Sequence, residues 1–272
     1  MANILRRRKV RPEELPIPPE EMRALVGLTD LAAFDNTSGA LVYDFLRPET
    51  YEAVLDFGSG CGRVARQLIQ QRPRPRRYVG IDLHRGMVEW CRRNLEPHAP
   101  GFSFEHHDVF HASFNPASTA RTLPFDLDDN GFTLVNAISV FTHLTQEQAE
   151  HYLRETSRVL RPDGVLNGTW FLFDKVDFPM MQDFQNALYI NEFDPSNAVI
   201  FDRTWLRNAA RDAGLIITDV NQPSIRGFQW HVMMRPSDSR LPEAEWPEDL
   251  AAIGRQPPPL APAGAAEIGL ED

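Results

Sequence analysis

The sequence is poor in cysteine, with only Cys61 and Cys91 among 272 residues. They form no CxxC pair, and neither has a histidine at the spacing of a zinc site. We therefore expect neither a metal site nor a disulfide scaffold. So few cysteines in a chain of this length are typical of the reducing cytoplasm, where we expect the protein to act.

The sequence also lacks a long apolar run. A membrane-spanning helix needs about 18 or more consecutive apolar residues, and no such stretch occurs. Positions 3–10 carry charge where a signal peptide would have its apolar core. These absences predict that the protein does not insert into a membrane.

Positive charge is outweighed by negative charge. The sequence has 28 Lys and Arg against 38 Asp and Glu, a formal net charge of -10. Binding to nucleic acid depends on neutralising phosphates, so no nucleic-acid partner is expected. The one basic cluster, at positions 6–9, lies in a segment with prolines and without periodicity, which predicts a flexible arm over 1–20. Prolines recur after Pro236, so we expect a disordered tail over 237–272 and a folded domain over 21–236.

Strand and helix patterns alternate within the predicted domain. Apolar residues recur at helical spacing in several segments, and Thr145 with Gln148 forms a capping-box pattern at the start of one helix. The alternation predicts an α/β fold: a doubly wound, mostly parallel seven-stranded sheet with an antiparallel hairpin at its C-terminal edge and helices on both faces. The predicted strands are 53–57, 78–83, 102–105, 132–138, 165–173, 215–220 and 228–234.

A glycine-rich turn follows the first predicted strand. Gly58, Gly60 and Gly62 would let backbone N–H groups approach a ligand with no Cβ in the way. A dinucleotide-binding loop has the spacing GxGxxG, whereas here the glycines alternate and Asp56 precedes them. A carboxylate at that position would repel a diphosphate and attract a cationic ligand.

Acidic residues also follow the next two predicted strands. Asp82 ends the second strand, where an acid can accept hydrogen bonds from both ribose hydroxyls of a nucleoside; capping of the next helix is the alternative. Leu83 and Met87 come after it and have a suitable size to pack against an adenine ring. Asp108 follows the third strand.

Residues 56–63, Asp-Phe-Gly-Ser-Gly-Cys-Gly-Arg, resemble motif I of the class I (Rossmann-like) S-adenosylmethionine-dependent methyltransferases. The segment 107–110, His-Asp-Val-Phe, is similar to the family segment after the third strand. The segment 132–144, which contains Ser-Val-Phe-Thr-His-Leu, is similar to the fourth strand and the turn after it. The resemblance covers about 53–173 well and 203–234 by pattern only.

This resemblance implies S-adenosylmethionine as the cofactor. In the family, the glycine loop wraps the amino-acid part of the cofactor. The acid at Asp108 would bind the adenine amine, and the backbone N–H of Val109 would meet a ring nitrogen. The implied cofactor-binding residues are Asp56, Gly58, Ser59, Gly60, Gly62, Arg63, Asp82, Leu83, Met87, Asp108, Val109, Ser139 and Val140.

His143 is the candidate catalytic base. An oxygen nucleophile needs a group that removes its proton, and histidine titrates near neutral pH. His143 lies just past the fourth strand, although it could equally fix the turn there. His106, His107 and His111 are expected to face solvent or the adenosine end, and His231 to be structural or to line the pocket wall.

Substrate contacts are expected from two segments that flank the resemblance. The first is 31–45, with Phe34, Asp35, Ser38 and Tyr43 as candidates. The second is the insert 174–201, with the candidates Phe178, Met180, Met181, Phe184, Tyr189 and Phe193.

These features predict an enzyme that methylates a small-molecule acceptor, preferably by O-methylation of a sugar, glycolipid or secondary metabolite. The main alternative is a non-catalytic protein of the same fold that binds the cofactor or a partner. An NAD-dependent oxidoreductase is disfavoured by the glycine spacing and by the lack of a Tyr-x-x-x-Lys pair. A nucleic-acid methyltransferase is disfavoured because 136–139 read Asn-Ala-Ile-Ser instead of Asn-Pro-Pro-Tyr. The sequence leaves the oligomeric state open.

Overall fold

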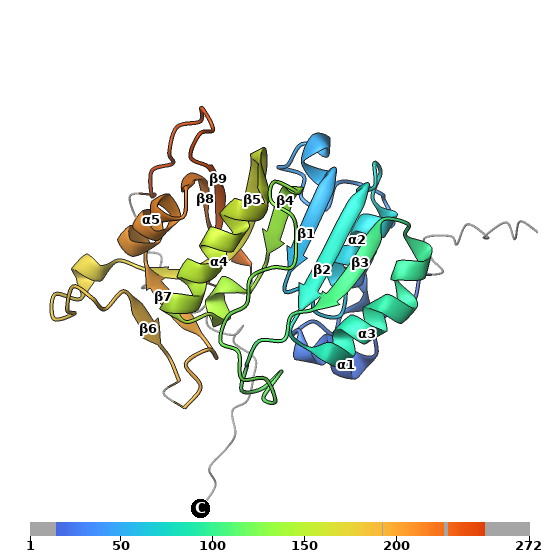
Figure 1. Cartoon of the computed structure of the whole chain (residues 1–272), viewed down its shortest axis with the longest axis horizontal. Helices are drawn as coiled ribbons and strands as arrows, with labels where there is room; N and C mark the ends of the chain where they lie inside the picture. The colour runs from blue at the N-terminus through green and yellow to red at the C-terminus, as the bar shows by residue number, and fades with distance from the viewer. Residues whose placement is uncertain (1–14, 192, 226–227, 248–272) are drawn as a thin grey trace, which may run out of the picture.

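In the computed structural model of the chain, residues 15–247 are described except 192, 226 and 227. They form a central sheet flanked by helices (Figure 1). Five parallel strands lie in the spatial order β3-β2-β1-β4-β5. Because the order reverses between β1 and β4, a crevice forms at the carboxyl ends of the strands, where ligands of such sheets bind. The strands are β1 Ala53–Phe57, β2 Arg77–Asp82, β3 Phe102–His106, β4 Phe132–Ala137 and β5 Leu160–Phe173.

An antiparallel hairpin completes this sheet. It consists of β8 (Leu215–Ile225) and β9 (Gln229–Pro236). β9 runs antiparallel to β5, with His231 opposite Thr169, and β8 pairs with β9. The predicted mostly parallel sheet with an antiparallel C-terminal hairpin is confirmed.

Two short strands lie in the insert 174–201 and were not predicted. β7 (Val199–Asp202) pairs parallel to the last residues of β5, and β6 (Ala187–Tyr189) pairs antiparallel to β7. The described part of the chain thus has nine strands instead of seven. Segments of three and four residues are too short to show a periodic pattern, and their pairing depends on β5 continuing beyond its partner β9.

Helices cover both faces of the sheet, as predicted. α2 (Arg63–Gln70) and α3 (Arg85–Asn94) pack on one face, and α4 (Gln146–Val159) and α5 (Arg203–Asp212) pack on the other. α4 begins with the capping box expected at Thr145. The remaining short elements are α1 (Glu20–Leu25) and the 3-10 turns η2 (Leu31–Phe34), η3 (Pro48–Tyr51), η4 (Glu96–His98), η5 (Phe141–His143) and η6 (Lys175–Asp177).

β5 begins earlier than predicted. Positions 162–164, expected as a turn, belong to the strand. Phe132 pairs with Leu160 and Leu134 with Val165, so the register shifts between these two pairs. The Pro-Asp-Gly segment is therefore an irregularity inside the β4–β5 ladder, because pairing resumes on both sides of it.

Residues at both predicted domain boundaries pack on the body. Leu15, expected in the arm, is buried, and its carbonyl oxygen accepts a hydrogen bond from Arg66. Ala244, expected in the tail, donates its N–H to the carbonyl of Ile217. Residues 1–14 of the predicted arm and 248–272 of the predicted tail lie outside the described residues. Among the described residues, no helix has the length and apolar character needed to cross a membrane.

Candidate functional site

A cavity of about 850 Å³ lies at the carboxyl ends of β1, β2 and β4. All the residues predicted to bind the cofactor line it, except Gly62 and Asp108, and so does His143. The residues brought together are Asp56, Gly58, Ser59, Gly60, Arg63, Asp82, Leu83, Met87, Val109, Ser139, Val140 and His143.

The glycine loop can adopt its shape only with glycine at its turns. Gly58 and Gly62 have φ of +77° and +82°, a region that side chains rarely adopt. A Cβ on Gly58 would lie 2.4 Å from Cγ2 of Val140. A Cβ on Gly62 would lie 2.6 Å from Cδ1 of Leu95, so Gly62 allows close packing on α3 and does not line the cavity.

Asp82 connects the glycine loop to the turn before α3. Its Oδ2 accepts the backbone N–H of Gly60 at 2.7 Å, and its Oδ1 accepts the N–H of His84 at 2.7 Å. The N-cap of α3 is His84, not Asp82. Burial raises the pKa of the Asp82 carboxyl, although these two hydrogen bonds favour its anion.

Asp56 lies in the cavity wall and is 2% exposed. Its Oδ2 accepts from the hydroxyl of Tyr78 at 2.7 Å, and its Oδ1 accepts from Nδ2 of Asn136 at 2.6 Å. Burial raises the pKa of this carboxyl against the effect of both donors. Asn136 also accepts from the hydroxyl of Tyr43, which lines the cavity too, at 2.8 Å. The sequence analysis missed Asn136 because its importance comes from pairing with a strand 80 positions away in sequence.

Asp108 does not reach the cavity. Its carboxylate accepts from Nδ2 of Asn115 at 2.9 Å, and this hydrogen bond lowers its pKa. The backbone N–H of Val109, expected to meet the adenine, donates to the carbonyl of His107 at 2.8 Å. The structure therefore does not bring Asp108 together with the other predicted cofactor residues.

His143 ends η5 and lines the cavity. Its Nδ1 lies 3.1 Å from the carbonyl oxygen of Ser196, which comes from the insert and lines the same cavity. Because a carbonyl only accepts hydrogen bonds, Nδ1 must carry the proton. The neutral ring then keeps its lone pair on Nε2, which is the form a base requires.

The other histidines have different surroundings. His107 lines the cavity and bonds the hydroxyl of Tyr152 at 2.8 Å, and burial lowers its pKa to about 4. His111 also lines the cavity. His106 bonds the carbonyl of Leu83, and His231 is buried against Asn167; neither lines the cavity.

The candidate substrate residues mostly lie elsewhere. From the segment 31–45, Tyr43 lines the cavity, whereas Phe34 is buried in a small apolar cluster and Asp35 pairs with Arg66. None of the six apolar candidates in the insert lines it, and Phe193 is 90% exposed. Lining residues that the sequence analysis missed include Leu25, Val26, Gly27, Leu28, Gln67, Phe110, Phe114, Asn136, Ile138, Leu144, Gln148, Tyr152 and Ser196.

The cavity suits a polar ligand at its glycine-loop end. Ser59 Oγ and Gln67 Oε1 are buried there without a hydrogen-bond partner among the described residues, and both residues line the cavity. Buried polar atoms normally have a partner, so these two are available to a ligand. No group of His, Cys, Asp and Glu side chains in the described residues is placed to hold a metal ion.

The chain is similar to known methyltransferases. Residues 54–164 match the family model described as a methyltransferase domain. Similar solved structures include the 1,6-didemethyltoxoflavin-N1-methyltransferase of Burkholderia thailandensis with bound 1,6-didemethyltoxoflavin and S-adenosylhomocysteine. It is 20% identical, with 68% of this chain and 71% of that chain covered and a TM-score of 0.47.

Two further solved structures are also similar to the chain. A S-adenosylmethionine-dependent methyltransferase from Mesorhizobium loti is 16% identical, with 70% and 93% coverage and a TM-score of 0.47. The [4+2]-cyclase SpnF is 22% identical, with 64% and 54% coverage and a TM-score of 0.43. The family match extends from β1, through the glycine loop, into β5, so residues 54–164 form a methyltransferase domain, of the class I type that uses S-adenosylmethionine as its cofactor.

Proposed function

We propose that the protein methylates a hydroxyl group of a small molecule, of the sugar, glycolipid or secondary-metabolite type, with His143 as the general base. The observation that carries the proposal is the hydrogen bond from His143 Nδ1 to the Ser196 carbonyl at 3.1 Å. Both residues lie in the wall of the cavity that contains the glycine loop. A base of fixed tautomer and a cofactor loop thus share one cavity.

The cofactor end of the cavity is the glycine-loop end. The cofactor supplies a methyl group on a positively charged sulfur, and the buried Asp56 carboxylate provides negative charge near that end. Arg63 lines the same wall and forms no ion pair with any described residue, so it can attract the carboxylate of the cofactor. We assign Asp82 to the ribose, and Leu83 and Met87 to the adenine, because all three line the cavity next to the glycine loop.

The remaining proposed cofactor contacts are those of Gly58, Ser59, Gly60, Val109, Ser139 and Val140, which complete the wall. Asp108 is not included, because its side chain is exposed and bonds Asn115. Ser59 Oγ has no hydrogen-bond partner within 15–191, 193–225 and 228–247, so it can donate to the cofactor or accept from it.

His143 would take the proton of the acceptor hydroxyl through Nε2. The Ser196 carbonyl stabilises the imidazolium that forms, since its oxygen bonds the Nδ1–H in both charge states. Removal of the proton makes the oxygen a better nucleophile, and the cavity walls hold it in line with the methyl group. Such alignment can supply up to about 7–11 kcal/mol of the barrier reduction.

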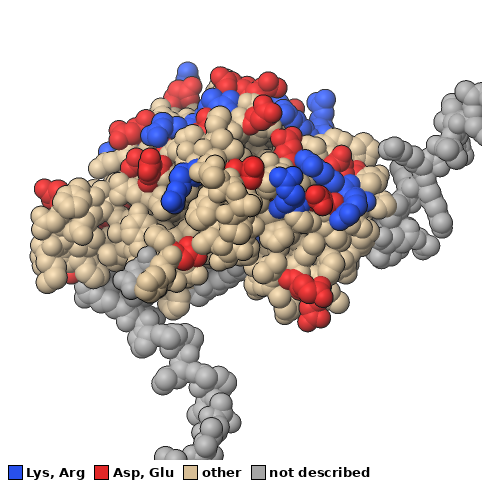
Figure 2. Space-filling model, turned by 60° about the horizontal axis from the view of Figure 1, so that its bottom comes forward, with Lys and Arg blue, Asp and Glu red and all other residues tan. Residues whose placement is uncertain are grey.

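The acceptor end has a mixed lining. Phe110, Phe114 and Leu144 offer apolar surface, and His111 and Gln148 offer polar groups. This combination is typical of small-molecule sites, where apolar walls bury the ligand and a few polar groups orient it. In Figure 2 the positive and negative side chains are interspersed on the face that the view shows, and they do not form the large basic patch of a nucleic-acid site, which supports a small molecule over nucleic acid.

We also propose the cytoplasm as the place of action. Cys61 and Cys91 are both buried and neither forms a disulfide. Free thiols are stable in a reducing compartment, which supports this assignment.

The test is a screen of hydroxylated acceptors with methyl-labelled S-adenosylmethionine, followed by kinetics of His143→Ala on the best acceptor. We expect kcat to fall by about 10²–10⁴, the usual contribution of a general base. Binding of S-adenosylhomocysteine, measured by calorimetry, should change little. His151→Gln, a surface histidine of α4 that bonds the Leu123 carbonyl, is the matched control. Unchanged turnover in His143→Ala would remove His143 from the mechanism.

A further inference from the structure

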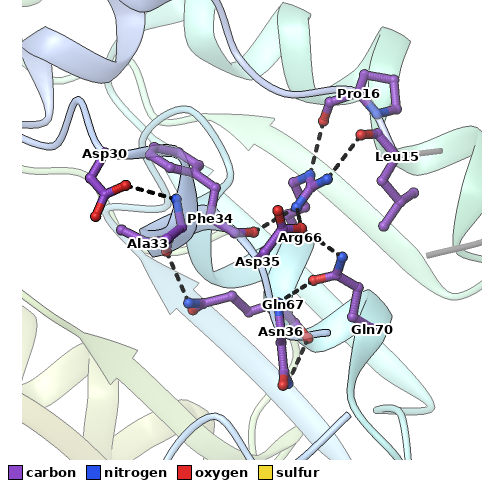
Figure 3. Close-up of polar contacts among 11 residues, drawn as sticks. Leu15, Pro16, Asp30, Ala33, Phe34, Asp35, Asn36, Arg66, Gln67 and Gln70 are labelled. Atoms are coloured by element: carbon purple, nitrogen blue, oxygen red, sulfur yellow. Dashed lines mark hydrogen bonds and ion pairs between the residues drawn. The ribbon is translucent and has the colours of Figure 1, made fainter. Parts of the chain in front are cut away.

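One guanidinium group holds both ends of an N-terminal segment, residues 15–35, which we call the strap. Arg66 on α2 donates from Nη2 to the carbonyl of Leu15 at 3.0 Å and from Nε to the carbonyl of Pro16 at 3.2 Å. At the other end of the strap it donates from Nη1 to the carbonyl of Phe34 at 2.8 Å and pairs with Asp35. Figure 3 shows the two ends of the strap converging on this side chain.

Arg66 is almost inaccessible, with 1% of its surface exposed. A buried guanidinium requires hydrogen-bond acceptors for its donors. Here three backbone carbonyls and one carboxylate, all from the strap, supply them. Arg66 is therefore satisfied only when both ends of the strap are docked on α2.

The middle of the strap covers the glycine loop. Leu25, Val26 and Leu28 line the cavity. Val26 lies directly on Gly60, because a Cβ on that glycine would be 2.9 Å from Val26 Cγ1. Leu28 packs with Val26 against an apolar cluster that contains Met87, a predicted adenine contact. A ligand bound at the glycine loop is thus covered by the strap.

Between its two buried ends the strap is lightly packed, and no residue from 19 to 33 is buried. α1 has no buried residue, and Leu25 and Leu31 are 50% and 49% exposed. Arg23 connects the parts of the strap before and after α1, because it donates from Nε to the Pro18 carbonyl at 3.1 Å and from Nη1 to the Thr29 carbonyl. A segment that has internal hydrogen bonds but buries little apolar surface can move as one unit. Such a segment separates from the rest of the protein at low free-energy cost.

We propose that Arg66 is a positioning residue for the cofactor. It holds both ends of the strap on α2, so that the apolar middle of the strap closes over the glycine loop. The cofactor enters and leaves when the middle of the strap moves away from the loop. The inference rests on the proposed placement of the cofactor at the glycine loop. It assigns the strap to the cofactor end of the cavity, whereas the sequence analysis assigned the overlapping segment 31–45 to the substrate.

The first test measures the dissociation rate of S-adenosylhomocysteine from the full-length chain. Arg66→Lys keeps the charge and loses the planar fork that reaches four acceptors. We expect its dissociation rate to rise about tenfold, because lids of this kind limit ligand release. Arg23→Gln removes the hydrogen bonds that connect Pro18 to Thr29 within the strap, and it should also raise the rate. Arg76→Gln, an exposed arginine paired with Glu52, should leave it unchanged.

The second test is hydrogen exchange of the wild-type chain with and without S-adenosylhomocysteine. We expect the amides of 20–33 to gain protection on binding, and this gain to be reduced in Arg23→Gln and in Arg66→Lys. A merely structural role of Arg66 would lower the melting temperature of Arg66→Lys and leave the dissociation rate of the folded protein unaltered.

The outcomes separate the two proposals. If the wild-type chain does not bind S-adenosylhomocysteine, the proposed cofactor site is wrong. If binding protects the glycine loop but leaves exchange in the strap unchanged, only the inference about Arg66 is overturned. If Arg66→Lys does not fold, Arg23→Gln decides: an unchanged dissociation rate in that variant overturns the inference.

Discussion

Nδ2 of Asn136 donates a hydrogen bond to Oδ1 of Asp56 at 2.6 Å, and the two side chains connect the neighbouring strands β4 and β1 at the cavity wall. The polar row continues across the sheet. Tyr78 on β2 donates to Asp56, Asn167 on β5 donates to Asn136 at 3.0 Å, and His231 on β9 bonds Asn167. The row ends at the Asp56 carboxyl group, and each of its two oxygens accepts a hydrogen bond from the row.

We expect Asn136→Ala to disrupt this row. The substitution leaves Asp56 Oδ1, the Tyr43 hydroxyl and Asn167 Nδ2 without the partner they have now. Leaving buried polar groups unpaired should lower the free energy of unfolding by about 3 kcal/mol, measured by urea denaturation. Affinity for S-adenosylhomocysteine should fall as well, because Asp56 is no longer held in place.

Asn94→Ala is the matched control for that variant. Asn94 bonds the carbonyl of Trp90 within its own helix and stands outside the cavity. Its loss should change the free energy of unfolding by about 0.5 kcal/mol or less. Equal effects of the two substitutions on the free energy of unfolding would show that the polar row does not stabilise the fold more than an ordinary side-chain hydrogen bond does.

Asp82→Ala and Asp108→Ala form a second pair, since both acids were predicted to bind the cofactor. Asp82 holds the Gly60 and His84 N–H groups at the cavity, whereas Asp108 is exposed and bonds Asn115. We expect Asp82→Ala to weaken binding of S-adenosylhomocysteine by about 100-fold, because charged hydrogen bonds are lost. Asp108→Ala should alter it by less than about threefold. Calorimetry of both variants checks this, and a large loss in Asp108→Ala would mean that 107–110 rearrange on binding.

Gly58→Ala tests the close approach of the glycine loop to the turn after β4. Gly58 has φ +77° and no room for a Cβ, which would meet Val140 Cγ2 at 2.4 Å. Gly39 has a similar φ of +70°, but its nearest neighbour would be 3.5 Å away. We expect Gly39→Ala to cost about 1 kcal/mol of unfolding free energy from backbone strain alone. Gly58→Ala should cost clearly more, and it alone should weaken cofactor binding.

Adding Val140→Ala to Gly58→Ala separates the steric clash with Val140 from the backbone strain at position 58. The second substitution removes the Cγ2 atom that would clash and leaves the backbone strain. Stability should recover toward that of Gly39→Ala. No recovery would show that the clash with Val140 is not the cause.

His107 should make the protein sensitive to mild acid. Its pKa is lowered from 6.5 to about 4 by burial. As the pH falls below 6.5, the unfolded chain binds a proton at this position that the folded chain does not accept. Stability is therefore complete above pH 6.5 and is lost progressively down to about pH 4. At pH 5 the loss from this residue is about 2 kcal/mol.

His107→Phe isolates that contribution, since the new ring can pack among Phe57, Phe125 and Tyr152. Urea denaturation at pH 8 gives the packing change, which does not depend on pH. The additional loss between pH 8 and pH 5 should be smaller in the variant than in the wild type. An identical pH dependence would mean that folded His107 titrates normally.

Much of the fold follows from local sequence patterns. β1 has the predicted bounds, and the Thr145–Gln148 capping box starts α4 as expected. These elements have apolar patterns or turn residues that act over a few positions, so a single sequence reveals them. β6 and β7 were missed because segments of three or four residues are too short to show a periodic pattern. Their pairing becomes possible only because β5 is long enough to pair with β7.

The sequence by itself predicted the glycine loop, because alternating glycines after an acid-containing strand favour a tight turn that a ligand can approach closely, and these residues are adjacent in the chain. Only the tertiary structure decided which other residues join it. Asn136, Ser196 and Leu25 reach the cavity from β4, the insert and the strap, and Asp108 turns away from it. This placement depends on the order of the strands, on the hydrogen bond from His143 to the Ser196 carbonyl, and on the hydrogen bonds from Arg66 to both ends of the strap. These contacts join residues that are too far apart in sequence for a local pattern to encode them.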